Sequence, residues 1–313
     1  MVGQRADTCP GSIASLDMTA QHLLMSSLAP SSRVVYAKEF RRYEQFCSSV
    51  LGADLCFPAT QPTMARYIAH LFDASYASST IATSVSAISY FHKALGHPDP
   101  SESFYIKRLL IGVSKCNPSR DMRVPISLPM LQQLIDAVPS IASDTYTAKM
   151  VRAMFSLAFF ALLRLSEITT TARTAHTLQH KDVILGDTEM QVCFSSYKHS
   201  GAHPFKLSIS QQPKGVCPVR LVRDYLMARG NTQGPLFVHL DQSPVTPHLF
   251  TEHLRLAVIA ARLTHLNISS HCFRLGRCTH LASLGYSEHK IKLVGRWKSD
   301  AYTRYIRVDA LSC

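Results

Sequence analysis

The sequence of 313 residues lacks any apolar run long enough to span a bilayer. Its N-terminus also lacks the charged-then-apolar pattern of a secretory signal. These two absences argue against the membrane and secreted classes, so we expect a protein with no membrane partner. Tryptophan is scarce as well, since Trp297 is the only one in the chain.

Paired cysteine motifs are missing, although the chain contains nine cysteines. The number is odd and no Cys-x-x-Cys occurs, which is typical of reduced thiols in a cytosolic or nuclear protein. Four residues resemble zinc ligands at first: His271, Cys272, Cys278 and His280. Their spacing on one continuous helix would direct Cys272 away from Cys278, and it matches no finger or ribbon pattern. We therefore predict that no metal is bound.

Acidic residues are few, with 21 Asp and Glu against 33 Lys and Arg, so the formal net charge is +12. This excess favours a polyanionic partner, either nucleic acid or an anionic membrane surface. The basic residues occur in both halves of the chain and on predicted helices. They therefore indicate a surface that follows a phosphate backbone rather than a simple basic tail.

The first part of the chain predicts a tail, a helical domain and a linker. Residues 1–16 are rich in Ser, Gly and Ala without periodicity, and we expect them to be disordered. Residues 17–114 contain four amphipathic helical repeats, two of them with expected serine N-caps at Ser31–Ser32 and Ser78–Ser79. Residues 115–126 hold two prolines and no periodicity, which is typical of an interdomain linker.

Residues 127–313 predict a second domain that is also largely helical. A nearly all-apolar helix over residues 148–163 is expected to form its buried centre. Three short β-like runs follow, at residues 182–185, 190–195 and 205–209, and turn residues separate them. The predicted fold class is therefore mainly α, with a small antiparallel β-sheet in the C-terminal domain.

Several polar residues of the first domain and linker are candidates for contact with a nucleic acid backbone. Three basic residues lie off the apolar face of their helix, a second helix has a small hydroxylated face, and the linker adds two arginines. An ordinary solvated linker explains these two arginines equally well. The candidates are Lys38, Arg41, Arg42, Thr80, Thr83, Ser84, Arg120 and Arg123.

Reactive side chains concentrate near the C-terminus, on short helices joined by tight turns. A helix capped by Ser269 or Ser270 would place His271 and Arg274 on one face, because they are three residues apart. A second short helix leads to Trp297, and a third carries two tyrosines on neighbouring turns. These tyrosines are Tyr302 and Tyr305.

Two further residues upstream have ordinary explanations when each is considered alone. Arg164 ends a deeply apolar helix, where Glu167 could hold it as an internal ion pair or orient it toward an anion. Lys198 occupies the turn between the second and third β-like runs, where most lysines are simply solvated. Their meaning depends on the residues that follow them in the chain.

Taken in order, Arg164, Lys198, His271-x-x-Arg274, Gly-x-Trp297 and Tyr305 resemble the tyrosine recombinase (phage-integrase) family. The segment Leu-Leu-Arg-Leu-Ser-Glu is similar to the first arginine box of that family. Gly-Arg-Trp-Lys-Ser-Asp-Ala-Tyr-Thr-Arg-Tyr-Ile-Arg is most similar to recombinases of eukaryotic mobile elements of the Crypton and DIRS types. Each box alone is a weak signal, but all of them in order are a strong one.

The resemblance covers residues 20–307 and implies a two-domain DNA clamp with an integrase-like catalytic domain. Residues 17–114 then correspond to a core-binding domain. The implied partners are double-stranded DNA and further copies of the chain, as a homo-tetramer on two duplexes and a monomer or dimer off DNA. The likeness to eukaryotic elements implies a nuclear location, although the chain has no compact basic import signal.

The resemblance also implies a division of chemical roles for cleavage of a phosphodiester. Two arginines neutralise the phosphate oxygens, a tyrosine attacks phosphorus, a base and an acid move protons, and an indole N–H donates to the phosphate. The product is a 3′-phosphotyrosine and a free 5′-hydroxyl, and the reaction needs no ATP, metal or other cofactor. The implied residues are Arg164 and Arg274 for the phosphate, Tyr305 as nucleophile, His271 as base, Lys198 as acid, Trp297 as donor and Glu167 in support.

Alternatives remain open at this point. Tyr302 is the rival nucleophile, because only eight residues separate Trp297 from Tyr305. A type IB topoisomerase uses the same constellation without synapsis, and a domesticated element could bind DNA without catalysis. A basic helical scaffold with no DNA role would leave the order of the motifs unexplained.

Overall fold

The computed structural model describes residues 13–54, 56–118, 121–171, 176–195 and 204–307. The chain divides into two compact units, Met1–Asp121 and Met122–Cys313, and each has its own hydrophobic core. The division falls within the segment 115–126. The described chain is mostly helical with one three-stranded antiparallel sheet in the second unit, which confirms the predicted fold class.

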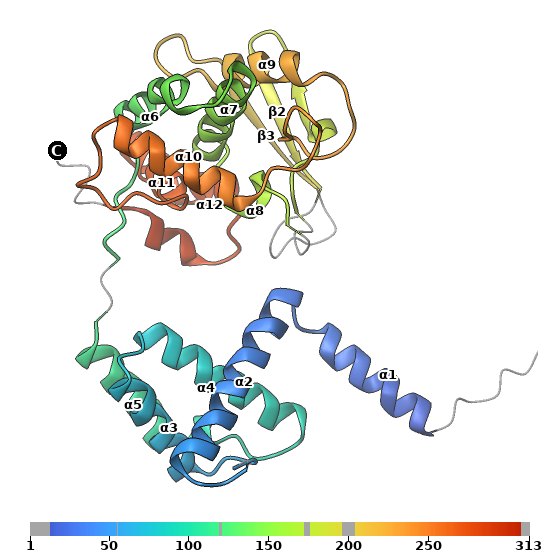
Figure 1. The fold of residues 1–313 in the computed structure, drawn as a ribbon, viewed down its shortest axis with the longest axis vertical. Helices are drawn as coiled ribbons and strands as arrows, with labels where there is room; N and C mark the ends of the chain where they lie inside the picture. The colour runs from blue at the N-terminus through green and yellow to red at the C-terminus, as the bar shows by residue number, and fades with distance from the viewer. Residues whose placement is uncertain (1–12, 55, 119–120, 172–175, 196–203, 308–313) are drawn as a thin grey trace, which may run out of the picture. The chain divides into compact units, whose positions relative to one another are not determined.

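The first unit is helical and is drawn in blue to green in Figure 1. Every side chain of its first helix that the structure describes is exposed. This helix begins inside the segment predicted as a tail, so residues 13–16 are helical instead, with apolar residues at helical spacing. The elements are α1 (Ile13–Ser26), α2 (Pro30–Val50), α3 (Gln61–Asp73), α4 (Ser78–Ala94), η1 (Pro100–Glu102) and α5 (Phe104–Cys116).

The N-caps of these helices follow the sequence rules only in part. Ser103 caps α5, since its hydroxyl accepts a hydrogen bond from the backbone N–H of Ile106. The two predicted serine caps are wrong, because α2 and α4 begin after Ala29 and Ala77, without a side-chain cap. A proline in the first turn already favours the start of α2. The Ser78 hydroxyl donates instead to the carbonyl of Asn117, at 2.6 Å.

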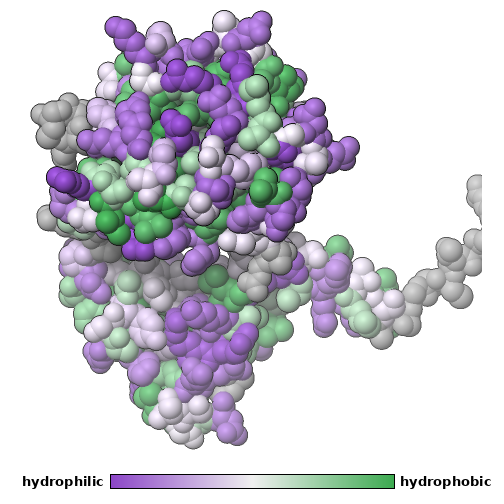
Figure 2. Space-filling model, turned by 45° about the horizontal axis from the view of Figure 1, so that its top comes forward, coloured by the Kyte–Doolittle hydropathy of each residue, from purple (hydrophilic) through white to green (hydrophobic). Residues whose placement is uncertain are grey.

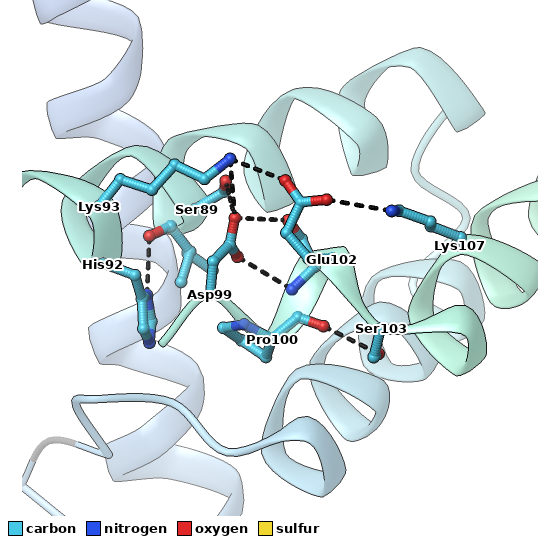
Figure 3. A network of polar contacts seen from close by, with 10 residues as sticks. Ser89, His92, Lys93, Asp99, Pro100, Glu102, Ser103 and Lys107 are labelled. Atoms are coloured by element: carbon cyan, nitrogen blue, oxygen red, sulfur yellow. Dashed lines mark hydrogen bonds and ion pairs between the residues drawn. The ribbon is translucent and has the colours of Figure 1, made fainter. Parts of the chain in front are cut away.

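A polar network fixes η1 between α4 and α5 (Figure 3). The Asp99 carboxylate accepts hydrogen bonds from the Ser89 hydroxyl and from the backbone N–H of Ser101. Lys93 contacts both Asp99, at 3.2 Å, and Glu102, at 2.8 Å. Because Lys107 on α5 also contacts Glu102, at 3.0 Å, the network connects α4, η1 and α5.

The second unit contains nine helical segments and the sheet among its described residues. Its elements are α6 (Leu128–Ile141), α7 (Thr145–Phe160), α8 (Leu165–Ile168), η2 (His180–Asp182), β1 (Val183–Leu185), β2 (Glu189–Phe194), β3 (Phe205–Ser210), α9 (Pro218–Arg229), α10 (Pro247–Ala260), α11 (Cys272–Ser283), α12 (Glu288–Gly295) and η3 (Asp300–Tyr305).

Helix α7 forms the centre of this unit, as the sequence predicts. Every residue from Ala153 to its end at Phe160 is buried. Helices α6, α9, α10 and α11 contact it (Figure 1). The sheet has the order β1-β2-β3, and β2 alternates buried and half-buried residues so that Phe194, at its end, points into the core.

The segment that enters the second unit crosses α11 at very short range. The backbone N–H of Ile126 donates to the Cys272 carbonyl at 3.2 Å. A Cβ atom at Gly276, one turn further along α11, would lie 1.9 Å from the Ile126 carbonyl oxygen. Glycine is therefore the residue that permits this crossing, which places the start of the unit against the helix that carries Arg274.

Two further observations concern the cysteines and the lengths of the helices. The seven described cysteines are unpaired, and four of them are buried. No helix in the described part of the chain is both long and apolar enough to cross a membrane. On the face that Figure 2 shows, hydrophilic side chains predominate and apolar ones form small groups.

Candidate active site

The first arginine of the site follows a sharp turn at the end of α7. Leu162 adopts a left-handed conformation, with φ of 48°, and turns the chain into α8. The Glu167 carboxylate accepts hydrogen bonds from the Arg164 backbone N–H, at 2.8 Å, and from its Nη1, at 3.1 Å. Glu167 is buried, whereas 23% of the Arg164 side chain is exposed. The ion pair therefore orients a guanidinium whose outer edge reaches the surface.

The second arginine, Arg274, lies in the first turn of α11 and is only 1% exposed. Its Nη1 donates to the carbonyl of Leu162, and its Nη2 donates to the carbonyl of Gly295 at 3.2 Å. Its Nε has no hydrogen-bond partner among the described residues. Backbone dipoles thus orient this guanidinium, and it forms no ion pair within the described part of the chain.

Burial lowers the pKa of Arg274 to about 9, and the like charges of Arg164 and Arg296 act in the same direction. The Glu167 carboxylate opposes this effect only in part. The guanidinium remains charged at neutral pH, but its positive charge is incompletely compensated. An anion bound next to it would stabilise the charged form and raise this pKa again.

Two aromatic rings lie beside the Arg274 guanidinium, and the His271 ring packs on one of them. The guanidinium carbon of Arg274 lies 4.9 Å from the Trp297 ring centroid and 5.5 Å from that of Tyr305. The Tyr305 ring in turn lies 4.8 Å from the His271 ring and 4.9 Å from the Trp297 ring. His271, Trp297 and Tyr305 are all half-buried. The structure therefore brings these four predicted residues into one cluster at the surface.

The two candidate tyrosines have different environments. Tyr302 is 2% exposed and packs in a small apolar cluster with Leu162 and Cys278. The neighbouring Glu288 carboxylate and burial raise the pKa of Tyr302 to about 12. Tyr305 lies against His271 and Arg274 instead. This arrangement favours Tyr305 as the residue that meets a phosphate.

Arg296 is a buried residue that binds Glu167 beneath the site, although no sequence pattern singles it out. Its Nη2 lies 2.8 Å from the second oxygen of Glu167, and its side chain is fully buried. One carboxylate thus binds two arginines from distant parts of the chain. Only its position between Gly295 and Trp297 could have drawn attention to it.

Two predicted residues, Lys198 and Arg120, lie outside the described residues. The predicted surface on the first unit needs correction at Ser84, which is completely buried and donates a hydrogen bond to Glu39. Arg42 is half-buried and forms an ion pair with the same carboxylate. Helix α2 packs on α4 here, so the prediction from hydroxyl character alone was wrong for Ser84.

The other predicted contact residues remain partly or fully accessible. Lys38 and Arg41 are exposed on α2. Thr80, Thr83 and Arg123 are each half-buried. The Thr83 hydroxyl donates to the Ser79 carbonyl at 2.8 Å, so it is already satisfied within its own helix.

The side chains that first resembled zinc ligands have other surroundings. No group of three or more His, Cys, Asp or Glu side chains that could hold a metal ion occurs among the described residues. Cys272 contacts the backbone N–H of Ser269, at 3.2 Å, at the start of α11. Cys278 packs in the apolar cluster around Tyr302.

Gly295 determines where the only tryptophan lies. A Cβ atom at this position would lie 1.6 Å from Cζ3 of Trp297. We expect Gly295→Ala to displace the indole from Arg274 and Tyr305, and so to shift the tryptophan fluorescence maximum. Covalent attachment to DNA should become slower by about tenfold or more, because small displacements of reacting groups are costly.

Gly112→Ala is the matched control for this change. Gly112 lies within α5, and a Cβ atom there would meet no atom within 4 Å. This substitution should leave the fluorescence unchanged and stabilise the helix by up to about 1 kcal/mol. Unchanged fluorescence and an unchanged reaction rate in Gly295→Ala would contradict the packing described here.

A sequence model of the phage integrase family matches residues 129–311, more than half of the chain. The fold and the arginine–tyrosine cluster lie within this range. The chain belongs to the phage integrase family. No match is found among curated proteins.

Solved structures of DNA-bound recombinases share the fold of this chain. The λ integrase dimer bound to a COC′ core site has a TM-score of 0.61 and 14% identity, and the match covers 94% of this chain and 77% of that one. XerH recombinase in a post-cleavage complex with palindromic difH has a TM-score of 0.64 and 14% identity, over 89% and 77% of the two chains. The Tn1549 transposon integrase with circular intermediate DNA has a TM-score of 0.65 and 13% identity, over 92% and 93%.

Proposed function

We propose that this chain is a site-specific DNA recombinase that cleaves DNA by forming a covalent bond between Tyr305 and a 3′-phosphate. The observation that carries the proposal is the buried guanidinium of Arg274. It is held by backbone carbonyls, it forms no ion pair within the described residues, and it lies beside the ring of Tyr305. An anion that reaches this guanidinium also reaches the tyrosine.

The charges of the site favour a phosphodiester as that anion. Arg164 and Arg296 each form an ion pair with Glu167, and the charge of the same carboxylate also acts on Arg274. A phosphodiester brings one negative charge, and its pentacoordinate transition state brings more. Fixed guanidinium groups in a buried site stabilise such developing charge without reorganising. The positive charge of the site therefore matches the transition state better than it matches the unreacted phosphodiester.

The proposed reaction exchanges one phosphoester for another. The Tyr305 oxygen forms a bond to phosphorus while the bond from phosphorus to the 5′-oxygen breaks. His271, whose ring packs on that of Tyr305, accepts the phenolic proton. Lys198, by family resemblance, gives a proton to the 5′-oxygen, and the Trp297 indole N–H donates to a phosphate oxygen. Attack by a new 5′-hydroxyl reverses these steps and rejoins the strand.

Double-stranded DNA is the proposed partner, and the named complexes of the relatives support this. The λ integrase structure holds a COC′ core site, the XerH structure holds a palindromic difH substrate, and the Tn1549 integrase structure holds a circular intermediate DNA. The excess of basic residues in this chain fits the same partner. Strand exchange between two duplexes would use four protomers. The similarity to Crypton and DIRS recombinases further suggests a eukaryotic mobile element and a nuclear location.

DNA binding should depend steeply on salt, because phosphate contacts release counterions. If six to ten phosphates are neutralised, affinity should fall by roughly 10³–10⁵ between 50 and 200 mM salt. Lys38→Ala and Arg41→Ala should each reduce the slope of log affinity against log salt by about one. Fluorescence anisotropy with labelled duplexes measures this slope.

The control for these substitutions is Arg255→Ala. Arg255 is exposed on α10, but its guanidinium is paired with Glu252 at 2.7 Å. Its loss should leave the salt slope unchanged. A nearly flat salt dependence of the unmodified protein would contradict a surface that follows the phosphate backbone.

The proposed activity can be tested on DNA of randomised sequence, so the target site need not be chosen beforehand. The protein is incubated with nicked duplexes in which the cut strand cannot be rejoined, because a short fragment diffuses away. Covalently attached DNA is isolated in detergent and sequenced. We expect enrichment of one target sequence attached through its 3′ end.

Other results would indicate a topoisomerase or a DNA-binding protein instead of a recombinase. Relaxation of supercoiled plasmid, with adducts but no recombinant products from two target sites, would identify a topoisomerase. Sequence-selective binding with no adduct on any substrate would identify a DNA-binding protein without catalysis. Either outcome would overturn the recombinase proposal.

A further inference from the structure

Arg296 occupies a position that its conformation disfavours. It terminates α12 in the left-handed region, with φ of 57° and ψ of 45°. Glycine adopts this conformation most easily, and other residues adopt it rarely. The side chain is nevertheless large, charged and fully buried. Such a combination is typical of a residue retained for what its side chain contacts.

The guanidinium of Arg296 joins three separate segments of the second unit. Nη2 donates to Glu167 at 2.8 Å and to the Leu162 carbonyl at 3.2 Å, and Nη1 donates to the Ala161 carbonyl at 3.1 Å. The guanidinium carbon also lies 3.9 Å from the ring centroid of Phe194. Phe194 ends β2, four residues before Lys198 in the sequence. Arg296 therefore contacts the α7–α8 turn and the end of β2.

Two of these contacts are shared with the arginines that face the phosphate. The Glu167 carboxylate accepts from the Arg164 guanidinium through one oxygen, and from the Arg296 guanidinium and the Arg164 backbone N–H through the other. The Leu162 carbonyl accepts hydrogen bonds from both Arg274 and Arg296. Both Nη atoms of the buried Arg296 side chain already donate to protein groups, so its direct contacts are with the residues that hold Arg164 and Arg274.

We propose that Arg296 is a positioning residue that fixes Arg164 and Arg274 in the geometry that cleavage requires. This inference rests on the proposed recombinase function. The planar guanidinium of Arg296 supplies several donors in fixed directions, so it can bind Glu167 and two carbonyls at once. A lysine has the charge but lacks this arrangement of donors. Arg296→Lys should therefore restore activity only in part.

The test compares cleavage by the folded, DNA-bound protein across matched variants. With saturating protein on a nicked target duplex, Arg296→Met should lower the rate constant of adduct formation by about a hundredfold, the size expected for misplaced reacting groups. DNA affinity should stay within about threefold, because many other contacts hold the duplex. Arg296→Lys should lie between Arg296→Met and the unmodified protein.

A double-mutant cycle tests whether Arg296 affects the cleavage rate through its contact with Glu167. Glu167→Gln combined with Arg296→Met should be little worse than the worse of the two single variants, since both act on Arg164 through one contact. Arg229→Met is the matched control. Arg229 is also a buried arginine, but it donates to the carbonyls of Gly230, Thr232 and Pro235. Its loss should lower the melting temperature and leave the rate of the folded protein unchanged.

The outcomes separate a positioning role from a merely structural one. If Arg296→Met lowers only the melting temperature and the folded protein cleaves at the unmodified rate, the inference is overturned. If Arg296→Met does not fold, Arg296→Lys and Arg296→Gln are measured at a temperature where they are folded, and unmodified rates in both would overturn it equally. A failure of the unmodified protein to cleave any DNA would overturn the proposed function, and this inference with it.

Discussion

Tyr305→Phe should abolish the covalent protein–DNA adduct, whereas Tyr302→Phe should retain it. The Tyr305 ring packs against His271 and lies 5.5 Å from the guanidinium carbon of Arg274. Tyr302 is buried beside Cys278, and the raised pKa of its hydroxyl next to Glu288 keeps it neutral. Only Tyr305 of these two has both a base and an arginine beside it. Denaturing gels of reactions on nicked duplexes measure the adduct.

The two substitutions serve as controls for one another, because each removes one hydroxyl and keeps the ring. Tyr302→Phe loses the interaction with Glu288 and should lower the melting temperature slightly. Tyr305→Phe should leave the melting temperature nearly unchanged. Adducts formed by Tyr305→Phe and lost in Tyr302→Phe would show that the nucleophile has been wrongly assigned.

Arg274→Lys should slow adduct formation by about 10²–10³-fold, the usual cost of losing one fixed donor to a developing charge. The carbonyls of Leu162 and Gly295 hold the planar guanidinium in place. Lysine keeps the charge but cannot reproduce two directed donors and a third toward the phosphate. Single-turnover rates on the nicked duplex measure the effect. DNA affinity should change by less than about tenfold.

Arg277→Lys is the control on the same helix. Arg277 lies one turn further along α11, and its guanidinium carbon is 5.1 Å from the ring centroid of Phe160, away from the tyrosine. This substitution should leave the rate of the folded protein unchanged. Equal rates for Arg274→Lys and the unmodified protein would contradict the role proposed for Arg274.

The sequence predicted those parts of the fold that depend on local pattern. The apolar run around α7 reflects a helix that is buried on all sides over its second half, and the alternation along β2 reflects one buried face, so both are visible without the structure. Cap positions were less predictable. Ser31 and Ser78 have the right chemistry, but the helices begin one or two residues earlier. Local sequence rules do not reveal which of several possible first residues of a helix the surrounding structure stabilises.

The order of the motifs predicted which residues form the site, but individual contacts were predictable only between residues that are close in sequence. Arg164 and Glu167 are three residues apart, and their ion pair was one of two alternatives expected from the sequence. Arg296 and Glu167 are 129 residues apart in the sequence, and no periodic pattern predicts their contact. The prediction that Ser84 contacts DNA was wrong for a related reason, because the burial of Ser84 depends on how α2 packs against α4. Long-range packing decides such contacts.

The most direct test of the account is to find which tyrosine carries the DNA. Arg304 lies between the two candidates, so trypsin separates them into residues 299–304, with Tyr302, and residues 305–307, with Tyr305. The unmodified protein is trapped on a nicked duplex, the DNA is digested to a short nucleotide remnant, and the tryptic peptides are analysed by tandem mass spectrometry. If the remnant blocks cleavage after Arg304, fragmentation of the longer peptide gives the same information. We expect the remnant on Tyr305, and a remnant on Tyr302 would contradict the assignment of Tyr305 as the nucleophile.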